Sequence, residues 1–347
     1  MLVPVIDSNN KPLMPCSNER ASYLIRSGSA KRCWRKGIFC IKLTKEPSAR
    51  QYQPIALGID PGSKREGYTA ATEKAVVLNI TTNTPDWVKA RMVVRRDLRR
   101  ARRYRKTPYR KCRLNRAVKH FIAPSTRARW GAKLRIINQL RKVLPITVIN
   151  VEDVKATTKN GKKRWNVSFS PLETGKNWFY TKIEGLDIEL VKTTGKQTKA
   201  RRDQRGFKKS SNKLDYKWEA HNVDSHCLAE IALNKELRPT HTVHKIEFLQ
   251  LHRRQLFFLN QRKGGVIRRY GGTVTFGMSR GAVLRYVGNI KPSKYSHLLT
   301  GLVYLGGCSN NRLSIHDLKD HKRLSHRVRI EDVRVLYNSK QTICIIN

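Results

Sequence analysis

A short apolar segment that ends in an acidic residue constrains this chain more than any other feature. Residues 55–60 read Ile-Ala-Leu-Gly-Ile-Asp and run directly into Pro61-Gly62. Two further segments with strand character, at 67–72 and 75–81, follow after short turns. This spacing predicts an antiparallel meander that opens an α/β domain. We therefore expect Asp60 at the end of a buried strand of that domain.

A second apolar run also leads into acidic residues. Residues 146–151 read Ile-Thr-Val-Ile-Asn-Val, an almost uniformly apolar pattern that is typical of a strand buried on both faces. Glu152 and Asp153 follow it directly. Because side chains alternate along a strand, only one of the two can point toward a shared site, and we assign that position to Glu152.

A helix expected over residues 220–236 carries two more candidates. His221 and Asp224 are three residues apart on it, so they share one face. Carboxylates that converge on two Mg²⁺ ions about 4 Å apart can activate water and stabilise a departing oxygen. We predict that Asp60, Glu152 and Asp224 bind two such ions, with Mn²⁺ as a possible substitute for Mg²⁺. His221 is expected to take a proton from the attacking water.

The balance of charge indicates a partner that carries phosphate groups. The 347 residues include 72 Lys and Arg against 25 Asp and Glu, a formal net charge of +47. Such an excess is typical of nucleic-acid binding, although a basic protein of ribosomal type, without catalysis, would explain it equally well.

An arginine-rich segment at 87–116 is expected to form a helix that is polar all round and therefore needs an acidic partner. A disordered basic tract is the alternative. The predicted nucleic-acid contacts in this segment are Arg91, Arg95, Arg96, Arg99, Arg100, Arg102, Arg103, Arg105, Arg110 and Arg113.

The cysteines and the apolar runs exclude several classes of protein. The seven cysteines are scattered, with no Cys-x-x-Cys pair, which argues against a disulfide framework and a zinc ribbon and favours a reducing cytoplasm. The first residues lack the pattern of a signal peptide. No run approaches the roughly 20 apolar residues of a membrane span.

The remaining segments have weaker patterns. At the N-terminus we expect a rigid turn at 12–15, a helix over 18–32 and a strand over 33–43. A second helix is expected over 126–143, with Ser125 as its N-cap. Residues 154–215 interleave basic and aromatic side chains, which suits either base stacking or the small core of an insert. Short strands between Gly-rich turns predict a compact β domain beyond residue 251.

Several of these motifs together resemble a known group of nucleases. Residues 58–64, 150–152 and 221–224 look like the first, second and third motifs of RuvC nucleases. The Pro-Leu-Met-Pro run at 12–15 resembles the PLMP module that opens the transposon-encoded IscB proteins, and 91–116 resembles their bridge helix. The resemblance spans nearly the whole chain.

The segment between the second and third motifs indicates which member of this group the chain resembles. IscB proteins carry an HNH nuclease there, and HNH chemistry requires histidine. This chain has no histidine between His120 and His221. The resemblance is therefore to IsrB, the relative that has the RuvC nuclease alone.

This resemblance implies a fold and its domain boundaries. The fold is an α/β, RNase H-like (RuvC) nuclease core with an inserted arginine-rich bridge helix, a small N-terminal module and a C-terminal β-rich domain. The boundaries are a PLMP module at 1–54, RuvC parts at 55–86, 121–153 and 216–251, a bridge helix at 87–120, a basic insert in place of HNH at 154–215, and a β-rich domain at 252–347 that reads the target-adjacent motif.

The resemblance also implies an activity and partners. A long omega RNA would guide the protein to duplex DNA beside a short target-adjacent motif, and the nuclease would nick the non-target strand. The protein is expected as a monomer within a ribonucleoprotein, in the prokaryotic cytoplasm and on the nucleoid when bound to DNA. Candidate contacts to the flanking motif are Arg268, Arg269, Arg280 and Arg285, for each of which a phosphate contact is the alternative.

The sequence is also compatible with two other functions. The chain could be a guide-free RuvC-type resolvase of branched DNA, which has no need of the PLMP module or the bridge helix. It could also be a non-catalytic RNA-binding protein with a RuvC-like fold, although all four metal-site positions hold suitable residues.

Overall fold

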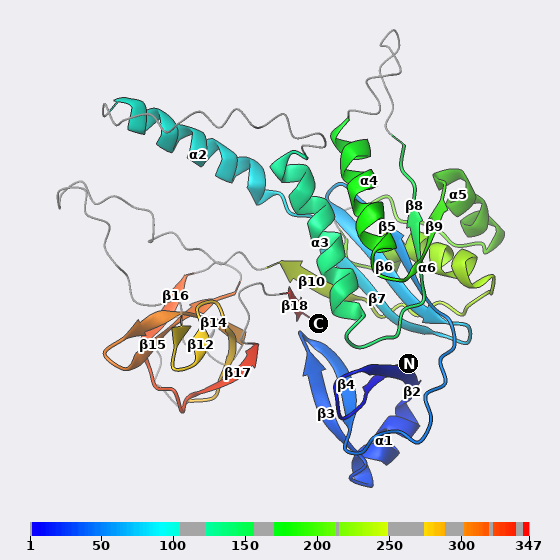
Figure 1. Ribbon diagram of the computed structural model, residues 1–347, viewed down its shortest axis with the longest axis horizontal. Coiled ribbons are helices and arrows are strands. Elements are labelled where there is room, and N and C mark those ends of the chain that lie inside the picture. The colour runs from blue at the N-terminus through cyan, green and yellow to red at the C-terminus, as the bar shows by residue number, and fades with distance from the viewer. Residues whose placement is uncertain are drawn as a thin grey trace. The chain divides into compact units, whose positions relative to one another are not determined.

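The computed structural model of the chain describes residues 2–104, 122–155, 170–212, 215–248, 274–288, 302–318, 322–337 and 343–346. They divide into two compact units, Met1–Ile246 with Ile346–Asn347, and Glu247–Ile345. Figure 1 gives the labels of the helices and strands in both units.

The first unit begins with a small sheet and one helix. Its elements are β1 (Leu2–Ile6), β2 (Pro12–Ser17), α1 (Asn18–Arg26), β3 (Ala30–Arg35) and β4 (Ile38–Leu43), and the strand order is β2-β1-β4-β3. Buried side chains from the strands and the helix form its core, among them Val5, Ala21 and Ile41.

Three expectations for this module were wrong. Residues 12–15 belong to strand β2 and not to a turn, which proline tolerates because β2 lies at the edge of its sheet. The helix ends at Arg26, where Gly28 follows with a φ of 73°. The single strand expected over 33–43 is a hairpin, β3 and β4, that turns at Lys36 and Gly37 with φ values of 49° and 90°.

The main sheet of the first unit confirms the mixed α/β class. Six of its strands lie in the order β10-β7-β6-β5-β8-β9. Their bounds are β5 (Ile55–Asp60), β6 (Arg65–Thr72), β7 (Val76–Asn83), β8 (Val148–Glu152), β9 (Glu189–Thr193) and β10 (His244–Phe248). Strand β6 runs antiparallel to both neighbours, whereas β5–β8, β8–β9 and β7–β10 are parallel pairs. The expected meander of β5, β6 and β7 is therefore present.

Helices lie on both faces of this sheet. The helices of this unit are α2 (Trp87–Tyr104), α3 (Pro124–Leu140), α4 (Pro171–Glu184), α5 (Gly195–Gln204) and α6 (Trp218–Leu233). Figure 1 shows α3 and α4 side by side, and the rings of Trp130 and Phe179 meet between them with centroids 5.0 Å apart. Lys133 of α3 pairs with Glu66 of β6, whereas the next residue, Gly67, abuts α6. Because neighbouring strand residues point to opposite faces, α3 and α6 cover opposite faces of the sheet.

Helix α6 approaches the sheet closely because two facing strand residues are glycines. A Cβ atom on Gly58 would lie 2.0 Å from the carbonyl oxygen of Ser225, and one on Gly67 would lie 1.9 Å from that of His221. Both distances are far below van der Waals contact. The two glycines therefore set the depth at which α6 lies on β5 and β6.

The described part of the segment 154–215, expected as a basic insert, adds to the main sheet and its helices. Strand β9 pairs with β8 in parallel along its whole length, so it extends the main sheet. Helix α4 packs beside α3, and α5 packs on α6. The aromatic Phe179 is fully buried between helices, which favours the core interpretation over base stacking for that residue.

The helix expected over 126–143 is α3, but its N-terminus differs from the expectation. The N-cap is Ala123, which makes no side-chain hydrogen bond, and Pro124 occupies the first helical turn. A proline there needs no hydrogen-bond partner, so a polar cap at Ser125 is not required.

The second unit consists of strands in its described residues, as expected for the C-terminal region. Five strands form an antiparallel sheet in the order β16-β15-β14-β13-β17, and β11 pairs with β12. The bounds are β11 (Val274–Thr275), β12 (Met278–Ser279), β13 (Val283–Tyr286), β14 (Leu302–Ser309), β15 (Arg312–Asp317), β16 (Arg323–Val328) and β17 (Val333–Tyr337). Strand β18 (Ile343–Ile346) begins in the second unit, and its last residue belongs to the first. Leu284, Leu305 and Ile315 are fully buried in the core of the second unit.

Candidate active site

Two of the expected acidic residues lie at the ends of adjacent parallel strands. Ile59 of β5 is in register with Val151 of β8, so Asp60 and Glu152 follow side by side. Asn150 donates from Nδ2 to the carbonyl oxygen of Leu228 on α6 over 2.9 Å. Residues two apart on a strand share a face, so Glu152 points to the α6 side as Asn150 does. The same alternation from Gly58 turns Asp60 toward α6.

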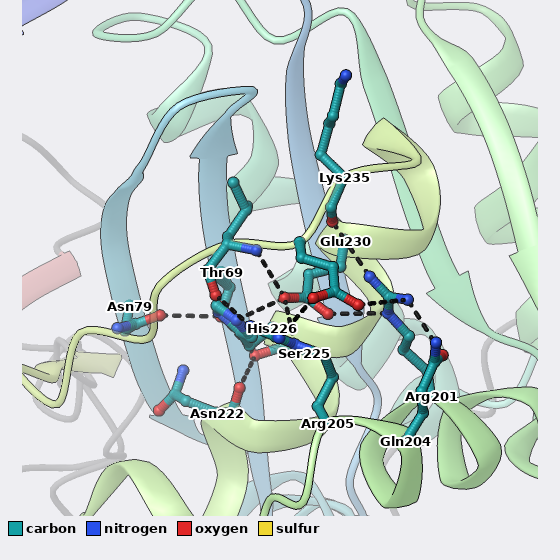
Figure 2. Close-up of polar contacts among 12 residues, drawn as sticks. Thr69, Asn79, Arg201, Gln204, Arg205, Asn222, Ser225, His226, Glu230 and Lys235 are labelled. Atoms are coloured by element: carbon teal, nitrogen blue, oxygen red, sulfur yellow. Dashed lines mark hydrogen bonds and ion pairs between the residues drawn. The ribbon is translucent and has the colours of Figure 1, made fainter.

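The third acidic residue comes from α6 itself. Asp224 is buried, and His221, one turn earlier on the helix, is buried as well. A series of hydrogen bonds between α6 and the sheet fixes which face of the helix points toward the strands. Figure 2 shows part of this series, where the hydroxyl oxygens of Ser225 and Thr69 lie 2.8 Å apart and Thr69 donates to Oδ1 of Asn79 over 2.9 Å.

Burial and crowding perturb the protonation of this cluster. Burial raises the pKa of Asp60 to about 8, and the charges of Glu152 and Asp224 add to the increase while that of Lys209 opposes it. Burial also raises the pKa of Glu152. The carboxyl group of Glu152 adds to the rise in the pKa of Asp60, whereas Asp60 partly offsets the rise in the pKa of Glu152.

Two basic side chains reach the same carboxylates. Nη1 of Arg202 lies 2.7 Å from Oδ1 of Asp224. The ammonium group of Lys209 pairs with Oδ2 of Asp224 and lies 4.0 Å from Oδ2 of Asp60. Lys209 therefore bridges an acid from the sheet and an acid from α6.

A buried ion network positions the helix that carries Arg202. Glu230 of α6 is fully buried and accepts from Nε of Arg201 at 2.9 Å and from Nε of Arg205 at 3.2 Å. Figure 2 shows both arginines extending from α5 to this one carboxylate. Burial raises the pKa of Glu230. The net pKa is nevertheless below its ordinary value, because His226, the Leu237 amide and the charge of Arg205 stabilise the carboxylate.

The N-terminus of α5 lies at the other acid of the cluster. A Cβ atom on Gly195 would lie 2.8 Å from Oε1 of Glu152. Thr194 and Gln197 form a capping box at this helix start. Helix α5 thus contacts the cluster twice, at Glu152 through its first residue and at Asp224 through Arg202.

The donor atoms of this cluster suit a hard divalent cation, since all three acids supply carboxylate oxygens. Within the part of the chain that the structure describes, however, no group of three or more His, Cys, Asp and Glu side chains is arranged to hold a metal ion. In this arrangement Asp224 is paired with Arg202 and Lys209.

Asp153, the residue most easily confused with Glu152, has a different role. Its Oδ1 lies 2.8 Å from Nζ of Lys176 and accepts from the hydroxyl of Tyr180 at 3.0 Å, and both partners belong to α4. Burial raises the pKa of Asp153. The net pKa is nevertheless below its ordinary value, because Lys176 and Tyr180 donate hydrogen bonds to the carboxylate. The alternation that the sequence predicted therefore separates the two acids correctly.

The predicted nucleic-acid contacts are placed only in part. Of the arginines expected in the bridge helix, those with exposed side chains on α2 are Arg91, Arg95, Arg96, Arg99 and Arg100. Arg102 and Arg103 belong to α2, but their side chains lie outside the description, as do Arg105, Arg110 and Arg113 altogether.

The candidate contacts to the flanking motif are also placed in part. Arg268 and Arg269 lie outside the described residues. Arg285 is exposed on β13, and Arg280 precedes it in the turn after β12. Nε of Arg280 is buried and makes no hydrogen bond within the described residues.

Sequence reasoning missed Arg202, Lys209 and the network at Glu230. The available signal was Glu230 itself, because an acid that is buried within a helix, as Glu230 is in α6, requires a cationic partner. The spacing of Arg201 and Arg205, four residues apart, would have supplied that partner.

Comparison with known proteins gives one sequence match and weak structural similarities. A family model described as RRXRR protein matches residues 3–167. Residues 99–103 read Arg-Arg-Ala-Arg-Arg, the pattern in that description. No curated protein matches the chain.

Solved structures of RuvC resemble parts of the chain at low identity. T. thermophilus RuvC in complex with a Holliday junction substrate is 10% identical, with a TM-score of 0.27, and the match covers 55% of this chain and 85% of that one. A second Thermus thermophilus RuvC structure is 12% identical, with a TM-score of 0.24, over 54% and 86% of the two chains. At these scores neither similarity assigns a fold, and the topology described above rests on the strand pairings alone.

None of the helices in the described residues is long and apolar enough to cross a membrane.

Proposed function

We propose that this protein is a divalent-cation-dependent DNA endonuclease that is guided by an RNA and nicks one strand of its target. The observation that carries the proposal is the convergence of Asp60, Glu152 and Asp224, from two parallel strands and one helix, on one face of the sheet. Carboxylates gathered in this way are costly to bury together, and cations that bind them offset that cost.

The strand order supports an RNase H-like core for this nuclease. In the series β7-β6-β5-β8-β9, only β6 runs opposite to the others. The acids lie at the carboxyl ends of β5 and β8, which are adjacent at the centre of this series, and such ends are a common location of ligand sites in α/β sheets.

The chain's own residues have distinct roles in this proposal. Asp60, Glu152 and Asp224 would hold two Mg²⁺ ions, with Mn²⁺ as a substitute, and the bound ions would activate water and stabilise the leaving oxygen. Because the pKa of Asp60 is raised to about 8, this carboxyl group has to lose a proton before it can ligate. His221, one turn from Asp224, is proposed to accept a proton from the water.

Guidance by RNA is supported by charge and by the sequence match. The chain has a net charge of +47, and the exposed arginines of α2 form a basic surface that attracts phosphate groups. The RRXRR match extends through this helix. In the proposed mode, guide pairing selects the DNA and a single nuclease centre cuts the displaced strand, while the paired strand is sequestered in the heteroduplex.

A purification experiment tests guidance by RNA. The protein is expressed together with its neighbouring genomic sequence, and the RNA that copurifies is sequenced. We expect one long RNA, and replacement of its guide segment should redirect Mg²⁺-dependent nicking to a new target. Cleavage of branched DNA without RNA would instead indicate a resolvase. Tight RNA binding without nicking would indicate a non-catalytic RNA-binding protein.

A further inference from the structure

We infer that Lys209 is the built-in counter-ion of the active site: its ammonium group occupies the place of a divalent cation between Asp60 and Asp224, and a divalent cation has to displace it. This inference rests on the proposed function and concerns the same carboxylates. It assigns to Lys209 a competitive role in cation binding, which a purely structural lysine would not have.

The position of the ammonium group is the first support. Lys209 pairs with Oδ2 of Asp224 and lies 4.0 Å from Oδ2 of Asp60, so a single positive charge bridges β5 and α6, two of the three elements that supply the proposed metal ligands. An ammonium group and a divalent cation bind the same carboxylate oxygens, and both cannot occupy one position.

The second support is the difference between Lys209 and Arg202. Arg202 belongs to α5, which Arg201 and Arg205 fix to the buried Glu230 (Figure 2), and its guanidinium group contacts Asp224 from that rigid helix. Lys209 follows the end of α5, and its side chain is 37% exposed. A lysine has a flexible stem, so Lys209 can leave the carboxylates for solvent or for a phosphate group while Arg202 stays in place.

The third support is electrostatic. Three acidic residues and two basic ones, Arg202 and Lys209, share one partly buried region. Without Lys209 the carboxylates would repel one another across a medium of low dielectric constant. Lys209 thus stabilises the cation-free protein. Once a divalent cation has displaced the ammonium group of Lys209, that group stays close enough to the cluster to contact a DNA phosphate bound there.

The test is the affinity of the RNA-free and DNA-free protein for Mn²⁺, measured by electron paramagnetic resonance of the unbound ion. Four proteins are compared: wild type, Lys209→Gln, Lys209→Arg and Lys208→Gln. Lys208 is the exposed neighbour and serves as the matched control. We expect Lys209→Gln to bind Mn²⁺ about tenfold more tightly, since it removes a half-buried competing charge. Lys209→Arg and Lys208→Gln should bind as the wild type does.

The outcomes separate this inference from the proposed function. Equal Mn²⁺ affinity in Lys209→Gln and wild type, with both proteins folded by circular dichroism, overturns the counter-ion role and leaves cation-dependent nicking standing. Weaker binding in Lys209→Gln also overturns it, since Lys209 would then support the site. Failure of all four proteins to bind Mn²⁺ contradicts the counter-ion role and the proposed nuclease alike. Because Lys209 is partly exposed, its replacement should leave the fold intact, and Lys209→Met provides a second uncharged variant.

Discussion

Arg202 donates from Nη1 to Oδ1 of Asp224 over 2.7 Å, and this contact joins a helix that follows the main sheet's last strand to the acid of α6. The arginine comes from a segment that the sequence suggested was a separate insert. In the structure, that segment supplies one edge of the sheet and the cations around the carboxylates. The candidate site is therefore completed by residues between the second and third acids, and not by the three acids alone.

The first prediction concerns the acids. Asp60→Ala, Glu152→Ala and Asp224→Ala should each abolish nicking, because each removes a proposed cation ligand, while guided DNA binding stays close to that of the wild type. Cleavage and gel-shift assays on the same preparations measure both. Loss of RNA or DNA binding together with cleavage would give these carboxylates a folding role instead. His221→Ala should be slower by about 10²- to 10⁴-fold if its role is proton transfer.

The second prediction concerns stability against pH without divalent cations. The folded protein holds the pKa of Asp60 at about 8, above its ordinary value of 3.8, so the folded state binds the proton more tightly than the unfolded state does. The contribution of Asp60 to the free energy of unfolding should therefore be greatest at low pH. It should fall as the pH rises from 3.8 to about 8. Denaturant unfolding in EDTA from pH 5 to pH 9 measures it. Asp60→Asn should lose much of this dependence, whereas an equal slope in both proteins would contradict the assignment to Asp60.

The third prediction concerns the glycines beneath α6. Gly58→Ala and Gly67→Ala place a methyl group against backbone carbonyl oxygens that cannot move without α6. Each should reduce the free energy of unfolding by about 3 kcal/mol or more, a large overpacking effect. The matched control is Gly131→Ala in α3, where a Cβ atom meets nothing within 4 Å and should be neutral or stabilising. Similar effects in all three variants would show that the close approach of α6 is not required.

The fourth prediction concerns the arginines of α2. If Arg95, Arg99 and Arg100 contact the guide RNA, changing all three to Gln should weaken RNA binding. It should also reduce the slope of log affinity against log salt concentration by about 0.7–0.9 for each lost contact. Titration of RNA at several salt concentrations measures the slope, and Asp60→Ala serves as the control with an unaltered slope. An unchanged slope in the triple variant would mean that the RNA binds elsewhere.

The elements that carry the acidic residues could be predicted from the sequence because they follow from local patterns. Apolar strands that end in an acid brought Asp60 and Glu152 to the correct edge of the sheet, and strand alternation separated Glu152 from Asp153. The three-residue spacing of His221 and Asp224 placed both on α6. These features depend on periodicity alone, and tertiary packing did not overrule them.

Other parts of the site could not be read from local patterns. Strand β9 lies at the sheet's edge and is only partly buried, so it lacks the apolar run that identified β5 and β8. Lys209 and Arg202 resemble any other basic residue of a chain with 72 of them. Their importance arises only when α5 packs on α6, where Arg201 and Arg205 pair with the buried carboxylate of Glu230.

The most direct test of the central claim is a cleavage assay on a matched DNA duplex with each strand labelled separately. The purified ribonucleoprotein is incubated with the duplex in Mg²⁺ and, in parallel, in EDTA. We predict a single cut in the displaced strand, dependent on Mg²⁺ and absent in Asp60→Ala, with the guide-paired strand intact. Cleavage of both strands at low protein concentration, or cleavage that persists in Asp60→Ala, would contradict a single nuclease centre built on these carboxylates.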